Sequence, residues 1–222
     1  NGNIFTFIAL KDTLRHKGLR NKLVLEIKNK GISDLKVLNA IQSIPRHLFM
    51  DSSFLDHAYQ DKAFPISAGQ TISQPYTVAF QTELLKISKG DKVLEVGTGS
   101  GYQTAVLCAL GAIVYSIERQ KELFKKTSLF LPKIGYYPKK LIFGDGYKGF
   151  ENEAPYDSII VTAGAPFIPK MLLSQLKINA KLIIPVGDKI QKMTVITRVS
   201  KEKFDKVEYG EFQFVPLLKE KN

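Results

Sequence analysis

The sequence has 222 residues, of which 44% are hydrophobic and 24% are charged, and its formal net charge is +11. These values predict a globular protein built as one large domain or as one domain with an appendage, and no apolar run approaches the roughly 20 residues that a membrane helix needs. Cys108 is the only cysteine, which excludes an intrachain disulfide and argues against a cysteine-based metal site. Lys and Arg are spread along the chain, which favours solvated surfaces over one dense anion-binding block.

Residues 1–68 are expected to form a helical N-terminal extension that covers a nucleotide-binding core. Residues 11–30 have the apolar spacing of a basic helix, and Leu35–Ile44 follows as a second one. The stretch Ile4–Leu10 is too short for a signal peptide and lacks a basic leader. We therefore expect a cytoplasmic protein, while a signal removed upstream of Asn1 stays open.

The next helix is predicted from Tyr76 to Ile87, because its apolar residues recur at helical spacing and Pro75 suits its first turn. Ser73 lies just before this helix. On composition alone, its hydroxyl is best interpreted as part of a helix cap.

Residues 92–102 read Lys-Val-Leu-Glu-Val-Gly-Thr-Gly-Ser-Gly-Tyr. A short apolar strand, three glycines at alternate positions and a helix over Gln103–Leu110 are typical of the first part of a nucleotide-binding βαβ unit. A second strand, Ala112–Ile117, ends in Glu118. An acid about 20 residues beyond the glycines suits hydrogen bonds to ribose hydroxyls, so the pattern predicts a nucleoside ligand.

A dinucleotide turn would place its third glycine at position 102, where this chain has Tyr102. Glu95 lies inside the strand just before the turn, and a pyrophosphate favours free N–H groups with no anion nearby. An acid there suits a cationic ligand such as S-adenosylmethionine, so the motif resembles the first motif of class I S-adenosylmethionine-dependent methyltransferases. A dinucleotide site and a glycine turn that only joins strand to helix are the alternatives.

The rest of the chain continues the alternation and then ends in antiparallel strands. The carboxyl ends of parallel strands share one edge of a sheet, so Gly97–Gly101, Glu118, Asp145 and Thr162–Pro166 are predicted to converge. The expected elements are a helix over Glu122–Leu131, strands Leu141–Phe143 and Tyr156–Val161, a helix over Leu172–Leu176, a strand Lys181–Pro185, and antiparallel strands Lys192–Val199 and Phe204–Tyr209.

Several segments together resemble the protein-L-isoaspartate O-methyltransferase family, and the matches run from about Ile32 to Leu218. The glycine motif is general to methyltransferases, whereas Thr71-Ile-Ser-Gln-Pro75 and Val161-Thr-Ala-Gly-Ala-Pro166 are much more specific. The matching segments are Ile44–Phe49, Ala58–Ile66, Thr71–Tyr76, Val93–Tyr102, Gly144–Gly146, Ala154–Pro166, Pro185–Gly187 and Phe214–Leu217.

The resemblance implies a Rossmann-like methyltransferase fold over residues 69–222 and methylation of the free α-carboxylate of L-isoaspartyl residues in damaged proteins and peptides. It assigns the active-site role to Ser73, with S-adenosylmethionine as donor and S-adenosylhomocysteine as product. The implied cofactor residues are Thr71, Ile72, Ser73, Glu95, Gly97, Gly99, Ser100, Gly101, Glu118, Asp145 and Gly146. The implied substrate residues are Ser73, Pro65, Ala163 and Val215.

On this basis we expect a monomer with no metal, no membrane and no stable nucleic-acid partner. One alternative is a methyltransferase acting on RNA or another small substrate, prompted by the net charge. Residues 162–166 argue against it, because they contain no paired prolines and no aromatic side chain to stack a flipped base. The second alternative is a protein with a methyltransferase-like fold that binds the cofactor but has lost the catalytic activity.

Overall fold

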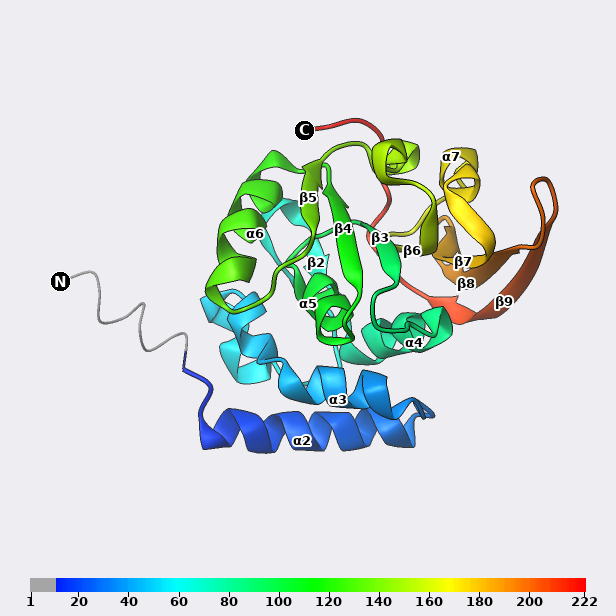
Figure 1. The fold of residues 1–222 in the computed structure, drawn as a ribbon. Coiled ribbons are helices and arrows are strands. Elements are labelled where there is room, and N and C mark those ends of the chain that lie inside the picture. Colours follow the sequence, from blue (N-terminus) through cyan, green and yellow to red (C-terminus); the bar gives the residue numbers. More distant parts are fainter. Residues whose placement is uncertain (1–10) are drawn as a thin grey trace.

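The computed structural model describes residues 11–222, so the expectation for Ile4–Leu10 lies outside it. Its centre is a seven-stranded sheet with the order β5-β4-β3-β6-β7-β8-β9 (Figure 1). The predicted α/β class with C-terminal antiparallel strands is confirmed. The parallel strands are β3 (Lys92–Val96), β4 (Ile113–Glu118), β5 (Lys140–Phe143), β6 (Tyr156–Val161) and β7 (Leu176–Gly187), and the antiparallel ones are β8 (Gln191–Arg198) and β9 (Phe204–Phe212).

The two faces of the sheet are buried in separate apolar layers. Val93 and Ile160 belong to one cluster, together with residues of two helices. Their immediate neighbours Leu94 and Ile159 point to the opposite face and belong to another. A parallel sheet covered on both faces accounts for the nearly continuous apolar runs of these strands. The first layer contains α4 (Pro75–Leu85) and α5 (Tyr102–Ala109), and the second contains α7 (Lys170–Ser174).

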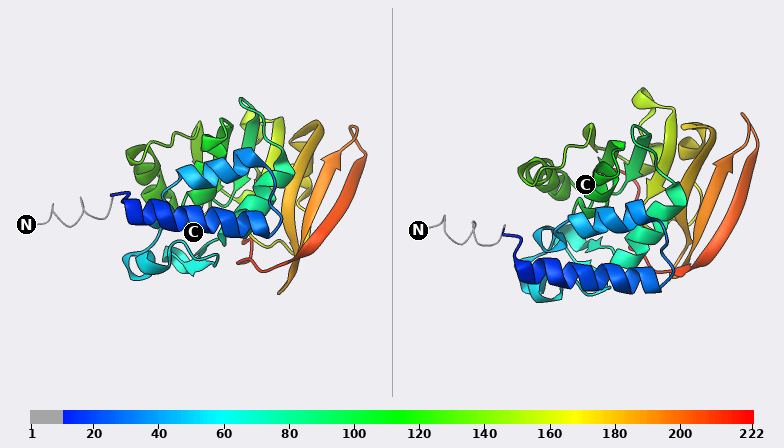
Figure 2. Two further views of the ribbon diagram at one scale, coloured as in Figure 1. Left: turned by 90° about the horizontal axis from the view of Figure 1, so that it is seen from below. Right: turned by 60° about the horizontal axis from the view of Figure 1, so that its bottom comes forward.

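The N-terminal helices form a further layer outside α4 and α5 (Figures 1 and 2). They are α2 (Leu14–Asn29) and α3 (Leu35–Ser43), each within a few residues of its predicted bounds. Two 3₁₀ helices, η1 (Arg46–Phe49) and η2 (Ser52–His57), continue the chain. Buried residues of this region share one apolar cluster with α5 and with α6 (Lys121–Lys133). A division of the chain near residue 68 stays a prediction.

The segment after α7 differs from its prediction. Leu176 was expected to end a helix, but α7 ends at Ser174 and Leu176 opens β7, opposite Tyr156. The register of β6 and β7 shifts between this pair and the next, which is Ser158 with Lys181. Asn179, in the part of β7 where the shift occurs, has φ +66°. Leu172 and Leu176 have helical spacing, and both are buried in the same cluster. The sequence pattern therefore looks helical across the point where the helix ends and the irregular strand begins. Within residues 11–222, no helix combines the length and apolar character needed to cross a membrane.

Candidate functional site

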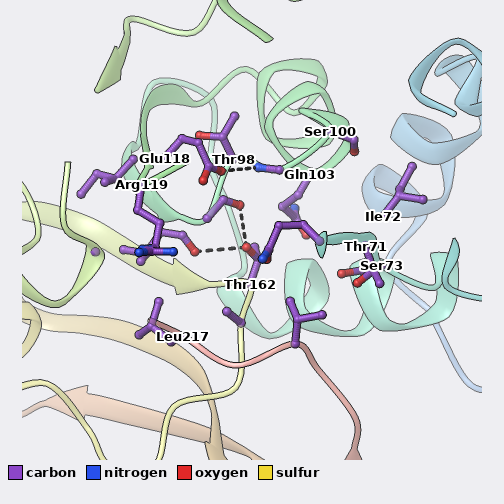
Figure 3. A pocket seen from close by; sticks show the side chains of 18 of the residues that line it. Thr71, Ile72, Ser73, Thr98, Ser100, Gln103, Glu118, Arg119, Thr162 and Leu217 are labelled. Carbon is purple, nitrogen blue, oxygen red and sulfur yellow. Dashed lines mark hydrogen bonds between the residues drawn. The ribbon is translucent and has the colours of Figure 1, made fainter. Parts of the chain in front are cut away.

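The turns that follow β3, β4, β5 and β6 meet at one edge of the sheet, as expected from parallel strands, and a cavity opens between them. Figure 3 shows Glu118 and Arg119 on one side of this cavity and Thr71, Ile72 and Ser73 on the other. We call it the donor cavity. From the strand ends its lining includes Gly97, Thr98 and Gly99, Glu118 and Arg119, Gly146, and Thr162 and Ala163.

The amides of the glycine turn are already bonded within the protein. The N–H groups of Gly97 and Thr98 donate to the carbonyl of Ile117, at 2.9 and 3.2 Å. The Gly99 N–H donates to one carboxylate oxygen of Glu118 at 2.8 Å, and the Gln120 N–H donates to the other at 2.8 Å. A pyrophosphate would need these donors and would meet the Glu118 charge, so the geometry argues against a dinucleotide site.

Two of the turns have no room for a side chain. Gly97 has φ +100°, and a Cβ there would overlap the hydroxyl of Thr162, which donates to the Gly97 carbonyl at 2.6 Å. A Cβ on Gly146 would overlap the side chain of Val96. At both positions a neighbouring side chain occupies the place of a Cβ, so glycine allows the turns at this edge of the sheet to pack closely together.

The opposite wall of the donor cavity comes from a short hairpin in which β1 (Phe64–Pro65) pairs with β2 (Thr71–Ile72). Ser73 follows β2 directly. It is not the helix cap, because Gln74 occupies the N-cap position of α4, and no hydrogen bond of the Ser73 hydroxyl occurs within residues 11–222. The interpretation of Ser73 as a capping residue is therefore wrong, and its hydroxyl is available to a ligand.

A buried arginine that the sequence did not identify as a site residue holds Ser73 in place. Arg46 is fully buried, and its guanidinium donates to the Ser73 carbonyl at 2.9 Å. It also donates to the carbonyls of Ala58 and Lys62, at 3.1 and 3.3 Å. One cation therefore ties three chain segments together behind Ser73. The available signal was a lone arginine inside the apolar segment Ile44–Phe49.

Most of the proposed site residues line the donor cavity. Three of the others do not line the cavity and instead have local roles in packing, capping or pairing. Gly101 is the N-cap of α5, and a Cβ there would overlap Thr127. Asp145 accepts a hydrogen bond from the Tyr147 amide at 2.9 Å, and Pro65 pairs with Thr71. The lining residues are Thr71, Ile72, Ser73, Gly97, Gly99, Ser100, Glu118, Gly146, Ala163 and Val215.

Glu95 is the fourth proposed residue that lies outside the lining. Its side chain is fully buried, and one oxygen accepts from the hydroxyls of Thr104 and Ser116, at 2.6 and 2.7 Å. Burial raises the pKa of the Glu95 carboxyl to about 8. It is therefore largely protonated at neutral pH. This placement does not support the expected countercharge to a cationic ligand and instead makes Glu95 a structural group beneath the turn.

The C-terminal segment crosses the carboxyl edge of the sheet and covers the donor cavity. Gly164 exchanges backbone hydrogen bonds with this segment, to the Val215 carbonyl at 2.8 Å and from the Leu217 amide at 2.7 Å. Further on, the Asn222 amide donates to the Arg119 carbonyl at 3.0 Å. Val215 to Leu218 therefore close the cavity on the side away from the glycine turn.

The comparisons with known proteins show the family to which this chain belongs. Residues 18–222 match the family model described as protein-L-isoaspartate (D-aspartate) O-methyltransferase. The chain belongs to this family. It is 70% identical to the protein-L-isoaspartate O-methyltransferase of Christiangramia forsetii and 68% identical to that of Flavobacterium psychrophilum, in each case over 213 residues that cover 96% of this chain and all of the relative.

Solved structures of the family share the fold. One protein-L-isoaspartate O-methyltransferase, 28% identical, superposes with a TM-score of 0.81 over 89% of this chain and 65% of its own length. A Plasmodium falciparum chain assigned to the same family, solved with S-adenosyl-L-homocysteine, is 27% identical with a TM-score of 0.76 over 90% of this chain and 98% of its own.

A second cavity of about 890 Å³ meets the donor cavity at Thr71 and Ser73, which line both. We call it the acceptor cleft. Its walls come from α4 and from the end of β9, and they include the aromatic rings of Phe80, Tyr209 and Phe212. The ring centroids of Phe80 lie 6.0 Å from Tyr209 and 5.3 Å from Phe212. In this member of the isoaspartyl methyltransferase family, Ser73 thus stands at the junction of two cavities.

Proposed function

We propose that this chain transfers a methyl group from S-adenosylmethionine to the free α-carboxylate of L-isoaspartyl residues in damaged proteins and peptides. The observation that carries the proposal is the meeting of the donor cavity and the acceptor cleft at Ser73, in a chain that belongs to the isoaspartyl methyltransferase family. Thr71 and Ser73 line both cavities, so a methyl donor bound in one and a methyl acceptor bound in the other would meet at Ser73.

The donor cavity suits a nucleoside that carries no phosphate. The Glu118 carboxylate lines it as a hydrogen-bond acceptor for ribose hydroxyls, and the side chains of Ile117 and Leu217 offer apolar surface to a base. Arg119 is the only cationic residue in its lining within residues 11–222. S-adenosylmethionine supplies a methyl group on a sulfonium sulfur when it is bound.

The acceptor chemistry needs no general base, because a carboxylate is already ionised at pH 7. Consistent with this, neither histidine nor cysteine lines either cavity in the described part of the chain. The protein's task is positioning, which can contribute about 7–11 kcal/mol to lowering a barrier. The Ser73 hydroxyl can donate a hydrogen bond to the acceptor carboxylate, while Arg46 fixes the Ser73 backbone and the C-terminal segment excludes water.

The decisive experiment uses labelled S-adenosylmethionine and two short peptides that differ only in isoaspartate or aspartate at one position. We expect base-labile label in the isoaspartyl peptide alone. Equal labelling of both peptides, or of neither while S-adenosylhomocysteine still binds, would contradict the proposal. Label in RNA but in neither peptide would support the alternative nucleic-acid substrate.

Further parts of the proposal concern the protein's surroundings. We expect it to act as a cytoplasmic monomer that forms no stable complex with nucleic acid. Within residues 11–222, Lys30 is the only cationic residue that lines the acceptor cleft, so the net charge of +11 is not gathered there. Sedimentation of the purified chain with and without RNA at 150 mM salt tests whether it is a monomer and whether it forms a stable complex with nucleic acid.

A further inference from the structure

A third cavity, of about 330 Å³, lies on the outer side of the glycine turn, between α6 and the N-terminal region. Its walls are mainly apolar and come from three separate parts of the chain. Leu48 and Met50 contribute from around η1, Ile66 from the loop before β2, and Leu123 and Leu129 from α6. This volume and lining match those of small-molecule sites in proteins.

The charge at this cavity is predominantly positive. Lys126 and Lys133 are seven residues apart on α6, so they project from the same side of the helix, and both line the cavity. Neither forms an ion pair within residues 11–222. Asp51 is the one acid in the lining, and its carboxylate already accepts from the amide and the hydroxyl of Ser53, each at 3.1 Å. The two ammonium groups are thus available to an anionic ligand.

The hydroxyl of Ser67 makes no hydrogen bond within the described residues, but it is fully buried behind the wall of the cavity and out of reach of an occupant. The site therefore offers apolar walls and two cations to the same occupant.

We propose that this cavity binds an amphipathic carboxylate: a single apolar chain of about ten carbons between the helix and the loop, with its carboxylate between Lys126 and Lys133. The occupant would lie against Gly99 and Ser100, which also line the donor cavity. Thr127 on α6 connects the two sites further, because its hydroxyl donates to the Gly99 carbonyl at 3.2 Å. The site shares no lining residue with the acceptor cleft.

Decanoate, kept below its micellar concentration, is the probe. The chain contains no tryptophan, so the substitution Leu129→Trp at the exposed end of the cavity places a single fluorescent reporter there. We expect a saturable change in its emission with decanoate and a much weaker response to 1-decanol. Ligand-observed NMR on the unsubstituted chain gives the same comparison if the tryptophan itself blocks the cavity.

Charge reversal tests the assignment against nonspecific partitioning. Lys126→Glu and Lys133→Glu are each expected to weaken decanoate binding at least fivefold. Lys125→Glu is the matched control, because Lys125 is exposed on the same helix but does not line the cavity, and it should leave binding unchanged. Equal effects of all three substitutions, no saturable binding, or loss of the decanoate signal when S-adenosylhomocysteine saturates the donor cavity would each overturn the proposal.

Discussion

The amide of Gly99 donates a 2.8 Å hydrogen bond to the carboxylate of Glu118, from the turn after one parallel strand to the end of its neighbour. The same carboxylate accepts from the Gln120 amide, so its position is fixed before any ligand enters. Glu118→Gln would keep the shape but replace an acceptor oxygen by an amide that cannot accept. Hydrogen bonds to a charged group are worth about 1.5–3 kcal/mol, so we expect S-adenosylhomocysteine affinity to fall roughly 10–100-fold by calorimetry.

Glu122→Gln provides the control for this loss, because Glu122 is exposed on α6 and outside every cavity described above. It should bind S-adenosylhomocysteine as the unsubstituted chain does. Unchanged affinity in Glu118→Gln would show that the Glu118 carboxylate does not hold the nucleoside.

Ser73→Ala separates chemistry from cofactor binding. The hydroxyl stands where the two cavities meet, and we propose that it orients the acceptor carboxylate. Loss of one hydrogen bond to an anion should lower kcat/KM for an isoaspartyl peptide about 10–100-fold. S-adenosylhomocysteine affinity should change less than twofold, and Ser53→Ala, at an exposed position of η2, should change neither quantity. Full activity of Ser73→Ala would remove the hydroxyl from the mechanism.

Local patterns predicted the sheet and the place of the donor cavity because both follow from strand geometry. Apolar runs such as Tyr156–Val161 mark strands buried on both faces, and parallel strands carry the turns that follow them to one edge. The place of Glu118 in the lining of the donor cavity could be predicted in this way, because it depends only on the length of one βαβ unit.

Arg46 and Glu95 could not be assigned from local patterns, because their roles depend on contacts far along the chain. Arg46 reaches the carbonyl of Ser73, 27 residues away, and Glu95 accepts from Ser116 on the neighbouring strand. An acid beside a glycine turn looks the same in sequence whether it faces the ligand or the helix behind it. Only the direction of its side chain in β3 decides, and here that direction is toward α5.

A buried histidine predicts a loss of stability in mild acid. His47 stacks on His16 at 3.8 Å between ring centroids and shares a 2.7 Å hydrogen bond with Tyr59, with Asp12 and Arg20 nearby. Burial, reinforced by His16, lowers the pKa of His47 from 6.5 to about 4. Between pH 6.5 and about 4, the His47 side chain therefore binds a proton in the unfolded chain but not in the folded chain. The stability that is present above pH 6.5 is lost as the pH falls toward 4.

Thermal unfolding of His47→Phe tests this linkage. At pH 7 the variant should be less stable by about 1 kcal/mol through the lost hydrogen bond. That deficit should shrink between pH 6.5 and 4.5, because phenylalanine has no proton to gain. His57→Gln, at an exposed histidine, should follow the unsubstituted chain at every pH. A deficit that stays constant across this range would show that His47 is not the group that titrates.

The buried carboxyl group of Glu95 predicts the opposite pH dependence of folding stability. Burial raises the pKa of its carboxyl to about 8, so the folded state holds a proton that the unfolded chain releases near pH 4.5. Its contribution to stability is complete below pH 4.5, declines as the pH rises, and is gone above about 8. The slope is at most about 1.4 kcal/mol per pH unit. Glu95→Gln keeps an oxygen for Thr104 and Ser116 but cannot ionise.

The free energy of unfolding of the Glu95→Gln variant, measured in urea at several pH values, should therefore fall less steeply between pH 6.5 and 8 than that of the unsubstituted chain. The window overlaps that of His47 below pH 6.5, where the two effects oppose each other, so only the difference between variant and parent isolates Glu95. Glu122→Gln should run parallel to the parent because that side chain is exposed. Parallel curves for Glu95→Gln as well would mean that the carboxylate is ionised in the folded protein and would restore Glu95 as a source of negative charge beneath the glycine turn.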